Sequence, residues 1–145
     1  MRLLSACSGS PNAALADGGG CRSFSTAIFF LLPAGHVSRL HRISSAEVWH
    51  FYLGAPLTVV ELAEHTVTRT VLGSDVLGGQ RLQHVVPGGT WFGCHPAAVG
   101  EPGSYSLVGC TVSPGFEFAD FELGEREVLL RDFPHAAEDI VRLTT

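Results

Sequence analysis

Short apolar segments that alternate with glycine and proline turns run through most of this 145-residue chain. Residues 25–32, 47–53 and 82–86 are rich in strand-forming side chains, and each segment ends at a turn signal that contains Pro and Gly. Such signals recur at roughly ten-residue intervals, the spacing of an antiparallel sandwich or barrel. The pattern therefore predicts an all-β fold.

The two ends of the chain break this pattern. Residues 125–133 and 136–143 place apolar side chains at helical spacing on either side of Pro134, which predicts two short helices. Residues 1–23 are rich in Ser, Gly and Ala without sustained periodicity. We therefore predict a flexible leader over 1–23 and one folded domain over 24–145.

Charge and hydropathy exclude two classes of partner. The net charge is −5, and all nine cationic residues are Arg with no basic run, so nucleic acid is not an expected partner. The longest apolar run, 27–32, stops at Pro33 and is too short to cross a bilayer. We expect a cytoplasmic protein with no membrane partner.

Residues 35–54 bring together the polar side chains most suited to chemistry. Side chains alternate along a strand, so Glu47 and Trp49 point to one face while His50 and Tyr52 point to the other. A hairpin that turns at Ser-Ser-Ala, 44–46, would place His41 close to Glu47. An imidazole and a carboxylate in such positions can bind a metal ion or act as acid and base.

The same residues resemble the first sequence motif of the cupins. Gly35, His41, Glu47 and Gly54 match the spacing of that motif, and Ile43 stands where cupins usually carry a second His.

A later segment is similar to the second cupin motif. Pro87 and Gly89 are in place within Pro-Gly-Gly-Thr-Trp-Phe, and Phe92 stands where a third metal-binding His would lie. Longer phrases over 24–145 resemble a group of small sugar-epimerase-like cupins of the cupin-5 type. The resemblance implies a double-stranded β-helix, or jelly-roll barrel, with two short C-terminal helices.

A metal-dependent cupin offers three His and one Glu, whereas this chain keeps only His41 and Glu47 in the matching positions. Two protein ligands rarely hold a transition metal firmly. A divalent metal would need His50 or His84 as a further ligand. A metal-free site, or a satisfied polar pair inside the barrel, are the alternatives.

The candidate site residues follow from placement in these motifs. The candidate catalytic residues are His41, Glu47, His50 and Tyr52. Candidate substrate-binding residues flank the same motifs, and they are Arg39, Trp49, Gln83, His84 and Trp91.

The leading hypothesis is a small-molecule-binding cupin, with metal-independent isomerase or epimerase chemistry on a sugar-like or nucleotide-linked compound. One alternative is a metal-dependent oxygenase or lyase, and another is a non-catalytic binding or storage barrel. The sequence does not decide whether the protein is an enzyme. Exposed sheet edges favour a homodimer.

Overall fold

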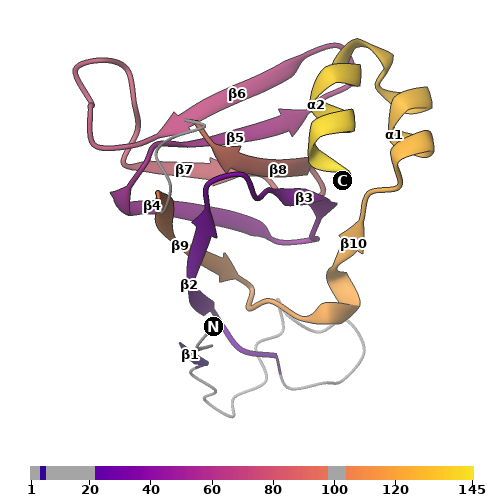
Figure 1. The fold of residues 1–145 in the computed structure, drawn as a ribbon. Coiled ribbons are helices and arrows are strands. Elements are labelled where there is room, and N and C mark those ends of the chain that lie inside the picture. Colours follow the sequence, from indigo (N-terminus) through magenta and orange to yellow (C-terminus); the bar gives the residue numbers. More distant parts are fainter. Residues whose placement is uncertain (1–3, 6–21, 98–103) are drawn as a thin grey trace.

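The computed structural model describes residues 4–5, 22–97 and 104–145. Within these residues the strands form two five-stranded sheets (Figure 1). In the first sheet the order is β1-β2-β9-β4-β7, with β1 (Leu4–Ser5), β2 (Thr26–Pro33), β4 (Ala46–Gly54), β7 (Gln83–Val86) and β9 (Tyr105–Ser113). In the second sheet it is β10-β3-β8-β5-β6, with β3 (Ser38–Arg42), β5 (Leu57–Leu62), β6 (Val67–Leu72), β8 (Trp91–Pro96) and β10 (Glu122–Leu123). The predicted all-β jelly roll is confirmed.

Alternation along the strands places the core between the two sheets. On β2, Phe30 packs against the core while its neighbours Phe29 and Leu31 are 60% and 54% exposed on the outer face. The core takes buried side chains from both sheets, including Leu57, Val59, Phe92, Cys94, Val108 and Cys110. The space between the sheets is therefore an apolar interior.

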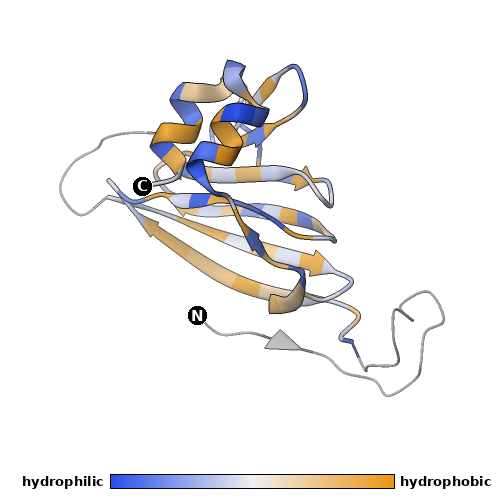
Figure 2. Ribbon diagram, turned by 90° about the vertical axis from the view of Figure 1, so that its right-hand side faces the viewer, coloured by the Kyte–Doolittle hydropathy of each residue, from blue (hydrophilic) through white to orange (hydrophobic). Residues whose placement is uncertain are grey.

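The two predicted helices cover the outer face of the second sheet. They are α1 (Arg126–Asp132) and α2 (Ala137–Leu143), joined by a 3-10 turn at Pro134–Ala136. Figure 2 shows them stacked against the strands. A second cluster fills this contact, with Leu40, Val60, Leu62, Leu129, Ala136, Ile140 and Leu143 buried. The helices thus cover one sheet and leave the outer face of the other uncovered.

The predicted hairpin between His41 and Glu47 is wrong. Strand β3 pairs with β8 and β10, whereas β4 pairs with β9 and β7, so the chain crosses from one sheet to the other between these residues. Gly88 lies close to the crossing, because a Cβ there would meet the Ser44 carbonyl oxygen at 2.2 Å. Since the two sheets face each other, His41 and Glu47 still point into one interior, but from opposite walls.

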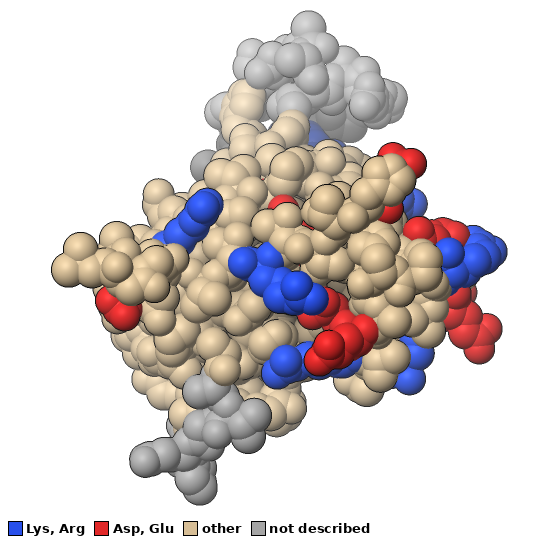
Figure 3. Space-filling model, turned by 90° about the horizontal axis from the view of Figure 1, so that it is seen from above, with Lys and Arg blue, Asp and Glu red and all other residues tan. Residues whose placement is uncertain are grey.

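Most of the predicted leader, residues 1–3 and 6–21, lies outside the described residues. Leu4–Ser5 pairs with β2, and the backbone of Ser23 accepts a hydrogen bond from Gly115 at 2.8 Å. In the described residues no helix has the length and apolar character needed to cross a bilayer. On the face drawn in Figure 3, acidic and basic side chains lie next to each other and much of the surface is uncharged.

Candidate functional site

A cavity of about 320 Å³ lies between the two sheets, at the end that the 116–121 segment covers. Its polar lining comes from strands of both sheets, and consists of Thr26, Ser38, His41, Glu47 and Cys110. The remaining lining residues are apolar, and they are Ile28, Phe30, Ile43, Trp49, Val112, Phe116, Phe118 and Phe121. The volume is at the low end of the range for small-molecule pockets, about 300–1,000 Å³.

Glu47 places a carboxyl group in this apolar surrounding. It lies on the inner face of β4 and is only 8% exposed. Burial disfavours the charged form and raises the pKa of Glu47 to about 7, although a hydrogen bond from the Cys110 thiol opposes the rise. Both protonation states are therefore populated near neutral pH, as a general acid or base requires.

His41 reaches the cavity from β3 on the opposite wall. Its Nδ1–H donates to the backbone carbonyl of Arg39 at 2.6 Å, so a neutral ring carries its lone pair on Nε2. Burial lowers the pKa of His41, and the bond to Arg39 only partly opposes this. The rings of Phe92 and Phe121 lie 4.3 and 5.2 Å from the imidazole, between centroids. This aromatic contact orients a neutral imidazole, which can act as a base through Nε2.

Trp49 forms part of the wall next to Glu47. The indole is 2% exposed and meets the rings of Phe30 and Phe92 edge to face. Its Nε1–H has no hydrogen-bond partner among the described residues. Because a buried donor without a partner costs free energy, an acceptor placed in the cavity would stabilise this position.

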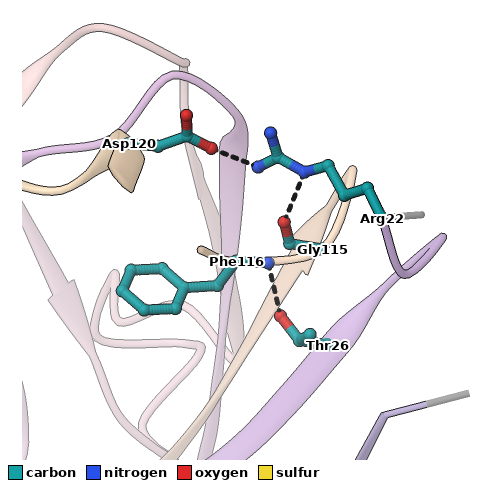
Figure 4. Close-up of polar contacts among 5 residues, drawn as sticks. All are labelled: Arg22, Thr26, Gly115, Phe116 and Asp120. Atoms are coloured by element: carbon teal, nitrogen blue, oxygen red, sulfur yellow. Dashed lines mark hydrogen bonds and ion pairs between the residues drawn. The ribbon is translucent and has the colours of Figure 1, made fainter. Parts of the chain in front are cut away.

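Three phenylalanines close the mouth of the cavity from one short segment. Arg22 holds this segment in place, since its Nε donates to the Gly115 carbonyl at 2.8 Å and its guanidinium pairs with Asp120 (Figure 4). The Phe116 amide also donates to Oγ1 of Thr26 at 2.8 Å. The segment, with a 3-10 turn at Phe118–Asp120, is therefore attached to β2 and to the residues before it.

Two predicted catalytic residues lie outside the cavity, on the outer face of the first sheet. His50 bonds to Oγ1 of Thr111 at 3.1 Å and to the amide of Gln83 at 2.9 Å. Tyr52 is 48% exposed and packs on Phe29, with ring centroids 5.5 Å apart. The alternation that brings Glu47 inside therefore places His50 and Tyr52 on the opposite face. Gln83, a predicted substrate-binding residue, lies on that face too.

Other predicted substrate-binding residues are also separate from the cavity. Arg39 is exposed, and Trp91 packs with the cluster under the helices, where the guanidinium of Arg42 lies 4.6 Å from its ring centroid. His84 does lie inside the barrel, but its Nε2 bonds to Glu61 at 2.6 Å. Of the substrate-binding predictions, only Trp49 lines the cavity.

Comparison with known proteins decides the family. Residues 5–124 match the family model described as Cupin superfamily (DUF985). The chain belongs to the cupin superfamily. No curated protein sequence matches this cupin.

Solved structures with similar folds come from several organisms. A protein from Shewanella oneidensis is 36% identical over 99% of this cupin and 85% of its own chain, with a TM-score of 0.82. A hypothetical protein from Leishmania major is 31% identical over 98% and 88%, with a TM-score of 0.81. A dTDP sugar isomerase from Desulfovibrio desulfuricans shares the fold at 14% identity over 86% and 83%, with a TM-score of 0.59.

The metal site of many cupins does not fit the residues of this one. Ile43 and Phe92 occupy two of the four expected ligand positions, and Phe92 is fully buried against the His41 ring. No group of three or more His, Cys, Asp or Glu within the described residues is placed to hold a metal ion. His41 and Glu47 alone make too few ligands for a firmly bound transition metal.

Sequence reasoning missed several cavity residues. Phe116, Phe118 and Phe121 were not predicted, although three phenylalanines within six residues after a Ser-Pro-Gly turn are a visible signal. Glu61, which does not line the cavity but bonds to His84, was missed too, and it is the single charged residue in a strand that is otherwise apolar except for Thr58. Nothing in the local pattern marks Cys110 as the hydrogen-bond partner of Glu47.

Proposed function

We propose that this cupin binds a small organic molecule in the cavity and catalyses a metal-independent proton transfer next to a carbonyl group, as an isomerase or epimerase does. One observation carries the proposal. A carboxyl group with a pKa of about 7 and a half-buried imidazole with a lowered pKa share one cavity, so an acid and a base coexist there near neutral pH.

In the proposed reaction, Nε2 of His41 takes a proton from the carbon next to the substrate carbonyl. The electron pair of the broken C–H bond forms the enol double bond, while protonated Glu47 gives its proton to the carbonyl oxygen. His41 then returns its proton to the neighbouring carbon, as in an isomerase, or to the same carbon after the enol has turned its other face to Nε2, as in an epimerase, and a hydroxyl proton returns to Glu47. No oxidant or reductant is needed.

The apolar surrounding supports this chemistry. Aromatic and aliphatic side chains lower the local polarity, which favours the protonated form of Glu47 and strengthens its interaction with a developing oxyanion. The likeness to a dTDP sugar isomerase supports the fold alone, at 14% identity. A sugar-like or nucleotide-linked substrate remains a prediction from the sequence resemblance.

Hydrogen–deuterium exchange tests the proposal without a known substrate. Acetophenone, cyclohexanone and D-fructose are incubated with the protein in D₂O, and loss of the proton signals next to the carbonyl is followed by NMR. We expect exchange above the buffer rate for at least one probe, and a loss of about 100-fold in His41→Asn. Glu64→Gln, at an exposed position, serves as the control. Binding of a probe without exchange would identify a non-catalytic barrel and contradict the proposal.

We also propose that a second copy of the chain covers the outer face of the first sheet. This face exposes Phe29, Leu31, Tyr52 and Val85, and no Arg, Asp or Glu of the described strands projects from it. An uncharged apolar patch can pack against its own copy without like-charge repulsion. Light scattering should give twice the 15.4 kDa chain mass, and Leu31→Arg should halve it. Leu77→Arg, in an exposed loop, should leave the mass unchanged.

A further inference from the structure

Within the described residues, the lining of the cavity carries no permanent cation that an anionic ligand could pair with. No Arg among the described residues lines it. Of the arginines near its walls in sequence, Arg22 pairs with Asp120 and Arg42 pairs with Glu122, while Arg39 is exposed and does not line the cavity. A phosphate or carboxylate group placed inside would be desolvated beside the Glu47 carboxyl with no opposite charge, which is unfavourable.

The apolar walls fit a ring compound. Aromatic side chains surround the cavity on several sides, from β2 (Phe30), β4 (Trp49) and the segment 116–121. Phe118 is 80% exposed although it lines the mouth, so its ring still faces water. A bound apolar ring would remove that surface from water, and aromatic rings pack favourably against one another.

Few polar groups line the cavity, and His41, Glu47 and Trp49 lie on β3 and β4. Nε2 of His41 can accept a hydrogen bond, the Glu47 carboxyl can donate or accept one, and the Trp49 indole donor has no partner in the part of the chain that the structure describes. One carbonyl oxygen can satisfy two donors, whereas a polyhydroxylated sugar would leave several hydroxyl groups against aromatic and aliphatic walls without partners.

We infer that the cavity takes a neutral ring compound, aromatic or alicyclic, that carries a single carbonyl group, in preference to an anionic or nucleotide-linked one. The inference rests on the proposed function for the site but concerns which molecule binds, not the reaction. The volume of about 320 Å³ is in keeping with a single small ring system.

Calorimetric titration at pH 6, where Glu47 is mostly protonated, with acetophenone, benzoate and dTDP tests the inference directly. Acetophenone and benzoate have similar rings and differ mainly in charge. We expect acetophenone to bind at least tenfold more tightly than benzoate, and dTDP not to bind. Equal binding of benzoate, or tighter binding of dTDP, would overturn the inference.

A pair of variants tests whether the aromatic mouth contributes. Phe118→Ser should weaken acetophenone binding at least threefold, because it removes an apolar wall at an exposed position where folding is little affected. Leu77→Ser is the control, since Leu77 is also exposed but lies in a loop that does not line the cavity. An equal loss of affinity in both variants would count against a role for Phe118.

NMR supplies a second readout at the polar end. The indole N–H signals of Trp49 and Trp91 are assigned by comparison with Trp91→Phe, and the Trp49 signal alone should shift when acetophenone is added. No shift at saturation would show that the acetophenone carbonyl does not accept a hydrogen bond from the Trp49 indole. Selective binding of acetophenone without hydrogen–deuterium exchange would support the ligand class and refute the catalytic proposal. Hydrogen–deuterium exchange seen only with nucleotide-linked sugars would support the catalytic proposal and contradict the proposed ligand class.

Discussion

Two buried carboxyl groups inside the barrel have opposite surroundings. Glu61 on β5 is 9% exposed and bonds to Nε2 of His84 at 2.6 Å, whereas Glu47 on β4 is 8% exposed and, among the described residues, receives a hydrogen bond from the Cys110 thiol alone. The first carboxyl has a nitrogen partner that can carry the opposite charge, and the second does not. From this comparison we expect the Glu61–His84 pair to stabilise the barrel, and Glu47 to exchange a proton or bond to a ligand.

Breaking the satisfied pair should have the largest effect. His84→Leu leaves the Glu61 carboxyl buried without a partner, and we expect a loss of about 3 kcal/mol in the free energy of unfolding, measured with urea. Replacing both residues by Leu should restore much of this loss. His41→Leu is the matched control, because His41 has no carboxylate bonded to it, and it should cost less. Equal losses in His84→Leu and His41→Leu would remove the distinction between the two regions.

The pH dependence of stability sharpens the comparison at Glu47. Its pKa rises from 4.5 in the unfolded chain to about 7 in the folded protein, so the native state binds more protons between these values. Stability contributed by this group is therefore present at low pH and lost as the pH rises from 4.5 through 7. The loss is about 3 kcal/mol, and Glu47→Gln should abolish it. Urea unfolding at pH 5 and pH 8 measures this, with Glu64→Gln expected to behave as the wild type.

The exchange reaction should follow the same titration. The proposed mechanism needs protonated Glu47 and neutral His41, so the rate should fall as the pH rises through about 7 and also at acidic pH below the lowered pKa of His41. Glu47→Gln should lower the rate at pH 6.5 by about 100-fold and remove the fall on the alkaline side. An unchanged alkaline limb in this variant would show that another group titrates.

The contact that holds the mouth segment should have the smallest effect. Arg22→Ala removes the bonds to Gly115 and Asp120, and we expect acetophenone affinity to fall roughly fivefold, about 1 kcal/mol. Arg131→Ala, which removes an exposed pair with Asp132, is the control. Equal affinities for the two variants would mean that the cavity does not depend on this segment.

Much of the fold could be predicted because strand periodicity and turns are local signals. The segments 25–32, 47–53 and 82–86 each overlap an observed strand, and the helical spacing after residue 124 gave both helices. Most of the predicted leader lies outside the described residues. The sequence motifs were sufficient to find the family, which the match over 5–124 confirmed.

The candidate site was predicted only in part. His41, Glu47 and Trp49 line one cavity as expected, but the reason given for the first two, a hairpin, was wrong. His50 and Tyr52 were chosen because they lie close to Glu47 in the sequence. Side chains of a strand alternate between its two faces, so residues close in sequence can point in opposite directions. Their displacement to the outer face follows from the same alternation that brings Glu47 inside.

The sequence by itself determined which side of each strand faces inward, because side-chain alternation is a property of the extended backbone. Only the tertiary structure decided which inward groups meet. Pairing between strands distant in sequence brings His84 to Glu61 and Cys110 to Glu47, and the tertiary structure places Phe121 against the His41 ring. The two carboxyl groups are almost equally buried, but they differ in their hydrogen-bond partners. The free energy of an ion depends on the partners and water around it, which no local pattern specifies.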